Sequence, residues 1–217
     1  TLVATTDANN GVINMGTMAV DGTFTLAPNG TGAVTVVNDA GLNLAASTMG
    51  GTFSGTATTG DISDSGALAI TGAATFITSA TGSNIILDHA SNAFSNSVEM
   101  RADDGSEAFG NITFVDSAAV DLDSSASANG DLFINGGTDG AVGGNLSVTA
   151  TTGNITQNTG LTISGTTTLT TSANDATITL NNTSNAFTGS IRITTNDSDG
   201  TAANVVIDGG TTALVLD

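Results

Sequence analysis

The sequence predicts an all-β protein, a parallel β-helix in which short strands coil into a stacked solenoid. Three observations predict this fold: a composition rich in turn and strand residues, a long internal repeat, and a shorter period inside that repeat. The 217 residues include 28 glycines and one proline, and 39% of them are hydrophobic. Gly, Asn and Asp favour tight turns, whereas Val, Ile, Thr and Phe favour strands. Many short strands joined by many turns therefore account for the composition.

The charge of the chain excludes two classes of partner. The chain contains twenty acidic residues and two basic ones, which gives a formal net charge of -18. Neither nucleic acid nor an anionic membrane surface is expected to bind, because almost nothing in the chain could neutralise their negative charges. No apolar run approaches the roughly 20 residues that a membrane-spanning helix needs, so we expect no membrane insertion. The absence of cysteine excludes a disulfide scaffold.

A long internal repeat organises the sequence. Residues Gly50–Asp104 align without a gap to Gly143–Asp197, at a shift of 93 positions, and 24 of the 55 aligned residues are identical. The match includes the segment Ser91–Phe94, which recurs as Ser184–Phe187. Shared composition alone would not preserve the register over such a length, so we infer an internal duplication of about 93 residues.

A shorter period lies inside the duplication. Apolar strand centres recur regularly, at Phe53, Phe76, Val98 and Val120, and then at Leu146, Leu169, Ile191 and Leu214. We interpret each long unit as four coils of about 23 residues. A barrel or sandwich gives no reason for such a nested period. The predicted organisation is a single solenoid segment over residues 1–217, with divergent coils in 1–49, a first long repeat in 50–142 and an incomplete second one in 143–217.

Alternation within each strand predicts which side chains face inward. Glu99 and Arg192 occupy the same repeat position, and each lies between apolar neighbours. A position that accepts either charge is expected to face solvent, and its apolar neighbours are expected to face a core built of stacked ladders.

The repeat resembles a known class of protein. The stretches 142–157, 161–169 and 181–191 are similar to repeat regions of large secreted bacterial surface proteins of the filamentous-haemagglutinin and autotransporter-passenger type. The resemblance implies a right-handed parallel β-helix, export through the outer membrane to the cell surface, and a role as stalk, filament or adhesin. The missing cysteines suit such an export route. The strand-like run 213–216 at the end leads us to expect a segment of something longer.

Few residues are candidates for catalysis. His89 is the single histidine, and its counterpart in the second repeat is Asn182, so we interpret it as a turn residue. Arg101 and Arg192 are the only cations. An enzyme acting on acidic polysaccharide needs several basic groups and an acid/base pair in a cleft. We therefore predict no catalytic residues and no enzymatic activity.

Two acidic turns at equivalent repeat positions are the candidate metal sites. They contain Asp103, Asp104 and Glu107 in the first repeat and Asp197 and Asp199 in the second. Carboxylates on tight turns are ligands that calcium favours. We interpret them as solvated turns and keep weak calcium binding as the alternative, with no other cofactor.

The remaining motifs have structural interpretations. Asn92–Phe94 and Asn185–Phe187 predict an Asn turn followed by an inward aromatic ring. Threonine runs such as Thr166–Thr168 could form an ice-binding array, but the drift in coil length argues against that.

The repeat and the resemblance together imply a structural function: a stiff shaft or filament at the bacterial cell surface. Its expected partner is another copy, stacked end to end or laterally. The alternative is an adhesive module that binds a surface glycan or matrix, either alone or with calcium. A polysaccharide-active enzyme is the third hypothesis.

Overall fold

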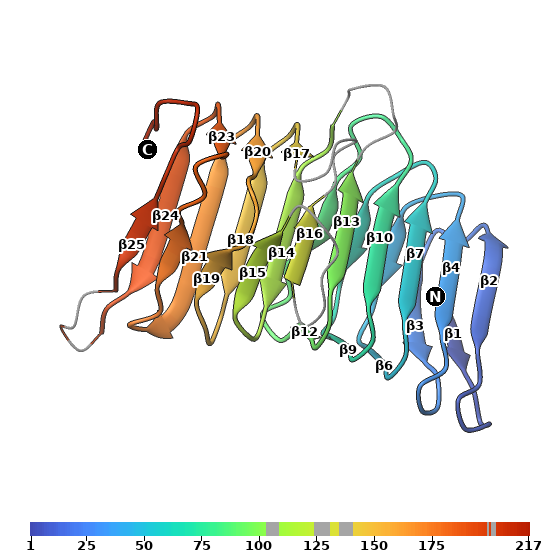
Figure 1. Ribbon diagram of the computed structural model, residues 1–217. Coiled ribbons are helices and arrows are strands. Elements are labelled where there is room, and N and C mark those ends of the chain that lie inside the picture. The colour runs from blue at the N-terminus through green and yellow to red at the C-terminus, as the bar shows by residue number, and fades with distance from the viewer. Residues whose placement is uncertain (103–108, 124–130, 135–140, 199, 201–202) are drawn as a thin grey trace.

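The computed structural model is a rod of stacked parallel β-coils (Figure 1). It describes residues 1–102, 109–123, 131–134, 141–198, 200 and 203–217, and of residues 131–134 and 141 only the backbone. The first coil, with β1 and β2, lies at one end of the rod, and the last, with β24 and β25, lies at the other. The described residues contain no helix that is long and apolar enough to cross a membrane.

The strands of the described residues form four sheets, two large and two small. The nine-stranded sheet has the order β1 (Leu2–Thr5), β3 (Thr23–Ala27), β5 (Leu42–Leu44), β8 (Ile62–Asp64), β11 (Ile85–Leu87), β14 (Ile112–Asp116), β18 (Leu146–Ala150), β21 (Thr167–Asn174) and β24 (Ile191–Asn196). The ten-stranded sheet has the order β2 (Ile13–Met18), β4 (Val34–Asn38), β7 (Phe53–Ala57), β10 (Ala74–Thr78), β13 (Val98–Ala102), β16 (Asp131–Ile134), β15 (Val120–Asp123), β19 (Ile155–Gln157), β22 (Ile178–Leu180) and β25 (Val205–Ile207).

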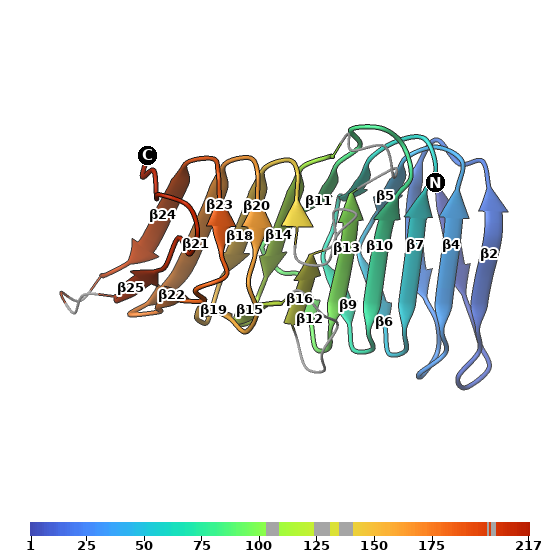
Figure 2. The ribbon, with the colours of Figure 1, turned by 45° about the horizontal axis from the view of Figure 1, so that its top comes forward.

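Two small sheets cover the sides of the rod. The first side sheet consists of β6 (Ser47–Met49), β9 (Leu68–Ile70) and β12 (Ala93–Phe94), and the second of β17 (Ala141–Val142), β20 (Thr162–Ile163) and β23 (Ala186–Phe187). In Figure 1 the first lies along the lower margin and the second along the upper margin. Figure 2 shows the stack from a direction turned by 45°.

Parallel pairing in register confirms the predicted β-solenoid. The rod has about eight turns of about 22 residues. In the first repeat Phe53 pairs with Ala74, and Ala74 pairs in turn with Val98. The second repeat reproduces both steps, from Leu146 to Thr167 and from Thr167 to Ile191.

Alternation along the strands builds the core as predicted. In β4, β7, β10 and β18 every second residue is buried and the residues between are half-buried. Parallel pairing places each inward residue over its counterpart, so Ile85, Ile112 and Leu146 form one ladder. Glu99 and Arg192 face outward, on β13 and β24.

Aromatic rings fill the core of the first repeat. The ring centroids of Phe53 and Phe76 lie 5.1 Å apart, those of Phe76 and Phe94 6.3 Å apart, and those of Phe94 and Phe114 5.1 Å apart. Such tilted and edge-on contacts add stability beyond the area that the rings bury. Phe94 and Phe187 both point inward after a buried asparagine, which confirms the interpretation of the two Asn–Phe segments.

Glycines stack at one corner of the coils because backbone approaches backbone there. A Cβ atom on Gly144 would collide with the carbonyl oxygen of Gly110, and one on Gly165 would lie only 2.5 Å from the carbonyl oxygen of Gly144. A real Cβ atom cannot come so close to a backbone oxygen. The corner therefore requires glycine in successive coils, whatever their lengths.

Equivalent strands of the two repeats lie in different large sheets. In the first, β7, β10 and β13 lie in the ten-stranded sheet, and β8, β11 and β14 lie in the nine-stranded sheet. In the second, the equivalent strands β18, β21 and β24 lie in the nine-stranded sheet, and β19, β22 and β25 lie in the ten-stranded sheet. The prediction of four coils in each unit is therefore wrong. The duplicated unit carries the chain through three coils and then across to the opposite sheet.

The exchange takes place at the end of the first repeat. β14 ends at Asp116 and β15 begins at Val120, so the chain crosses to the ten-stranded sheet without entering the first side sheet. β16 then joins the same sheet between β13 and β15, and β17 begins the second side sheet. Leu146 consequently pairs with Ile112, whereas the period of about 23 residues predicted that it stacks on Val120.

We expect Thr167→Val to stabilise the rod. Thr167 is 1% exposed, and its hydroxyl has no hydrogen-bond partner among the described residues. Removing an unpaired buried hydroxyl should raise the free energy of unfolding by about 1 kcal/mol. Thr171→Val is the matched control, because Thr171 is equally buried on the same strand but donates to the Ala176 carbonyl at 3.2 Å. Chemical denaturation should move the two variants in opposite directions, and equal losses would contradict the assignment.

Candidate functional site

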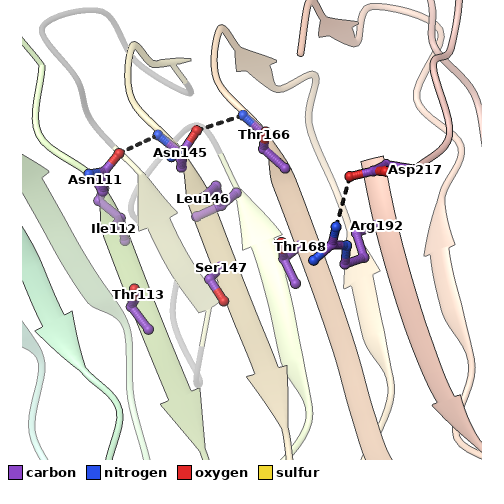
Figure 3. A pocket seen from close by; sticks show the side chains of 10 residues that line it. All are labelled: Asn111, Ile112, Thr113, Asn145, Leu146, Ser147, Thr166, Thr168, Arg192 and Asp217. Atoms are coloured by element: carbon purple, nitrogen blue, oxygen red, sulfur yellow. Dashed lines mark hydrogen bonds and ion pairs between the residues drawn. The ribbon is translucent and has the colours of Figure 1, made fainter. Parts of the chain in front are cut away.

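A groove on the outer face of the nine-stranded sheet is the candidate site. It has a volume of about 480 Å³ and crosses β14, β18, β21 and β24 (Figure 3). Its lining consists of Asn111, Ile112, Thr113, Asn145, Leu146, Ser147, Thr166, Thr168, Arg192 and Asp217. The groove therefore spans the coil in which the repeats exchange sheets.

A ladder of side-chain hydrogen bonds forms one edge of the groove. The backbone N–H of Asn145 donates to Asn111 Oδ1 at 2.8 Å, and the N–H of Thr166 donates to Asn145 Oδ1 at 2.8 Å. Both bonds are visible in Figure 3. The ladder continues toward the N-terminus, where the N–H of Asn111 donates to Asn84 Oδ1 at 2.9 Å. Each asparagine thus holds the corner of the following coil, and this edge of the groove is pre-formed.

A row of small hydroxyl side chains forms the floor. Thr113 pairs with Ser147, Ser147 with Thr168, and Thr168 with Arg192, so the row runs along the rod axis. Neighbouring side chains in such a row lie about 4.8 Å apart, the spacing of adjacent strands. Ile112 and Leu146 are each 1% exposed and lie beneath this polar layer. The groove thus offers a ligand hydroxyl groups rather than apolar surface.

An ion pair closes the far end of the groove. Arg192 Nη2 donates to Asp217 Oδ2 at 2.8 Å, and the two side chains are 59% and 56% exposed. Pairing of Ile191 with Leu216 brings these outward neighbours side by side. An exposed pair of this kind contributes little to folding, about 0–1 kcal/mol. Its guanidinium and carboxylate remain accessible as an adjacent donor and acceptor.

Asp116 carries a buried carboxyl group at the end of β14, where the chain crosses from the nine-stranded to the ten-stranded sheet. It is 1% exposed, and its Oδ1 accepts hydrogen bonds from the N–H groups of Phe94 and Ala118, both at 3.3 Å. Burial raises the pKa of Asp116 above its ordinary value, although the backbone donors oppose the shift. The carboxyl group holds the β12 strand of the preceding coil and lies in the core, away from the groove.

Two buried asparagines hold the first and second side sheets in the same way. Asn92 Oδ1 accepts from the N–H of Leu68 at 2.9 Å, and Asn185 Oδ1 accepts from the N–H of Leu161 at 3.0 Å. Asn92 also donates to Asp64 Oδ2 at 2.6 Å, and Asn185 donates to the carbonyl of Asp208 at 2.9 Å. These residues therefore have a structural role, as predicted.

His89 is confirmed as a turn residue. Its Nδ1 accepts a hydrogen bond from the N–H of Ser91 at 3.1 Å. Asn182 at the equivalent position accepts from the N–H of Ser184 at 2.9 Å, so an imidazole and an amide serve the same turn.

Of the five carboxylates predicted as calcium ligands, the structure describes only Asp197. Asp103, Asp104, Glu107 and Asp199 lie outside the described residues. Asp197 is exposed, and its Oδ1 accepts from the N–H of Gly200 at 2.9 Å, which closes a tight turn. The described part of the chain contains no group of three or more His, Cys, Asp or Glu side chains able to hold a metal. Calcium binding at the two acidic turns stays a prediction.

The groove leaves no distinct signal in the sequence. Of its lining residues, Leu146, Arg192, Thr166 and Thr168 drew attention in the sequence, all for other reasons. Outward alternation marks Thr113 and Ser147 individually as surface positions. The pairing of Ile112 with Leu146 brings them together, whereas the regular period of the sequence predicts that Leu146 stacks on Val120.

The fold and its repeated corners define a β-solenoid repeat protein. Residues 31–101 and 109–194 match a family described as repeats of unknown function (DUF5649). These segments make up most of the chain, which therefore belongs to this family. The two segments end at Arg101 and Thr194, 93 positions apart, in agreement with the internal duplication. Searches of curated proteins and of solved structures found no match.

We expect Asp116→Asn to stabilise the protein at neutral pH. Folding raises the pKa of this carboxyl group. Such a group favours the native state while protonated, and this contribution is lost as the pH rises through the raised pKa. An amide oxygen can accept the same backbone donors without a buried charge, as Asn92 does one coil earlier. The melting temperature of the variant should exceed that of the wild type at pH 7, and the difference should shrink on acidification.

Asp7→Asn is the control for this measurement, because Asp7 is exposed. A difference for Asp116→Asn that stays constant with pH would contradict the assignment of the buried carboxylate.

Proposed function

We propose that this chain is a rod-forming structural segment of a secreted bacterial surface protein, acting as the shaft of an adhesin or as a filament subunit. The observation that carries the proposal is the distribution of exposed apolar side chains. Among the described residues, the large exposed hydrophobics are Val3, Val12, Val205, Val206, Leu214, Val215 and Leu216. All of them belong to the first or the last coil, so the rod has polar sides and apolar ends.

Continuous stacking makes the rod stiff. Each interior coil pairs with the coil before it and the coil after it, and its core residues pack in ladders shared with both. In such solenoids every coil depends on its neighbours, and the shape follows from the stack. About eight coils at the strand spacing give a rod on the order of 40 Å long.

The apolar ends support self-association. Within residues 1–217, β1 and β2 are the edge strands at one end; at the other end β25 is an edge strand, and β24 pairs with the segment around Leu216. Unpaired edge strands are templates for pairing with another strand. Stacking the last coil of one copy on the first coil of the next would continue both large sheets, cover Val12 and Val206, and generate an open fibre.

The proposed location rests on the resemblance to exported surface proteins and on two properties of the sequence. The chain lacks cysteine, and a chain without disulfides can be exported unfolded. Its net charge of -18 favours solubility of long rods through mutual repulsion. The proposed role is mechanical rather than catalytic, in keeping with a histidine that serves a turn.

A lysine at either end should block stacking. We expect the wild-type chain to form longer rods as its concentration rises, and Val12→Lys or Val206→Lys to remain single, because a charged edge resists strand pairing. Sedimentation velocity and electron microscopy over a concentration series measure this. Thr75→Lys is the control, since Thr75 faces outward on β10 in the middle of the rod. Wild-type rods that stay single at every concentration would refute end-to-end stacking.

A further inference from the structure

We infer that the groove over β14, β18, β21 and β24 binds an uncharged linear oligosaccharide. The site does not depend on the mechanical role proposed above, because its hydroxyl row runs along one side of the rod and only its charged end, Arg192 and Asp217, lies on the last coil. It rests on the chemistry of the lining, on the direction of the hydroxyl row and on the pre-formed edge.

The charges of the groove select against other classes of ligand. Arg192 and Asp217 offset one another, so the groove carries no net charge at its charged end. The chain as a whole is strongly acidic, which disfavours polyanions such as nucleic acids and polyuronates. The apolar side chains Ile112 and Leu146 are buried, which leaves little surface for a hydrophobic ligand.

The accessible groups match a polyhydroxylated ligand. Thr113, Ser147 and Thr168 each carry a hydroxyl that can donate and accept hydrogen bonds. The guanidinium of Arg192 adds only donors, and the carboxylate of Asp217 adds only acceptors. The two groups lie 2.8 Å from each other. A pair of adjacent sugar hydroxyls can accept from the guanidinium while donating to the carboxylate.

The geometry of the row suits a linear chain of sugar units. The hydroxyl side chains succeed one another along the rod axis at the strand spacing of about 4.8 Å, which is comparable with the length of one hexose unit. The Asn111–Asn145–Thr166 ladder runs beside them and holds the edge in place without a ligand. The groove volume of about 480 Å³ is typical of pockets that bind small organic ligands. The groove can therefore accept a short oligosaccharide laid across the strands.

The exchange of sheets supplies a matched control for this site. Ser54 and Ser147 occupy the same repeat position, both are half-buried and both face outward. Ser54 lies on β7 in the ten-stranded sheet, whereas Ser147 lies on β18 in the nine-stranded sheet and lines the groove. A bulky substitution at either serine should destabilise the fold by a similar amount, but only the one at Ser147 fills the groove.

The test is a titration of the isotopically labelled chain with uncharged linear tetrasaccharides, cellotetraose and mannotetraose, followed by NMR. A tetrasaccharide of uronic acid is the acidic comparison. At least one neutral sugar should shift the amide signals of Ser147, Thr168 and Arg192, and the uronate should bind more weakly. Ser147→Leu and Arg192→Met should weaken binding at least tenfold. Ser54→Leu should bind like the wild type.

Three results would overturn the inference. The first is the absence of shifts at the groove with both neutral sugars. The second is tighter binding of the uronate, which would identify an anion site at Arg192. The third is an equal loss of affinity in Ser54→Leu and Ser147→Leu at matched melting temperatures, which would place the binding elsewhere on the rod.

Discussion

Parallel pairing of each coil with the next is the interaction on which the rest of the structure depends. In such pairing a residue lies over its counterpart one coil earlier, so an inward side chain always meets an inward side chain. Ile85, Ile112 and Leu146 form one such ladder although their spacing along the chain is unequal. One apolar residue can replace another in such a ladder, because the ladder requires only that each coil contribute an apolar side chain. Outward positions carry no such constraint, and Glu99 and Arg192 can replace one another.

The corners absorb the variation in coil length that the strands cannot. A strand must stay in register to keep its ladder, whereas a turn can lengthen as long as its two ends return to the same place. Stacked glycines and asparagines define that place. Gly144 and Gly165 allow backbone to touch backbone, and Asn111 and Asn145 tie each corner to the next through side-chain oxygens. Coils of different length can therefore share one solenoid.

The local features of the fold could be predicted from the sequence because they depend on neighbouring residues. Alternation in Val98–Met100, the turn at His89 and the inward ring of Phe94 belong to this group. The exchange of sheets could not be predicted. An ungapped alignment matches Phe53 with Leu146, but it contains no information about the sheet to which either belongs. That outcome is associated with the short corner Ser117–Ala119, which consists of small residues as does the corner Ser65–Ala67 that leads into the first side sheet.

The exchange separates equivalence in sequence from equivalence in space. Ser54 and Ser147 belong to the same repeat position, yet they lie on different faces of the rod because their strands belong to different sheets. Each face of the rod therefore combines outward positions from different parts of the repeat, and a duplication does not simply present the same surface twice. The inward positions still build matching ladders in both copies, because a ladder depends on the coil above and below and not on the sheet. A duplicated β-solenoid can thus retain one core while its faces acquire different chemistry, as Glu99 on one face and the Arg192–Asp217 pair on the other illustrate.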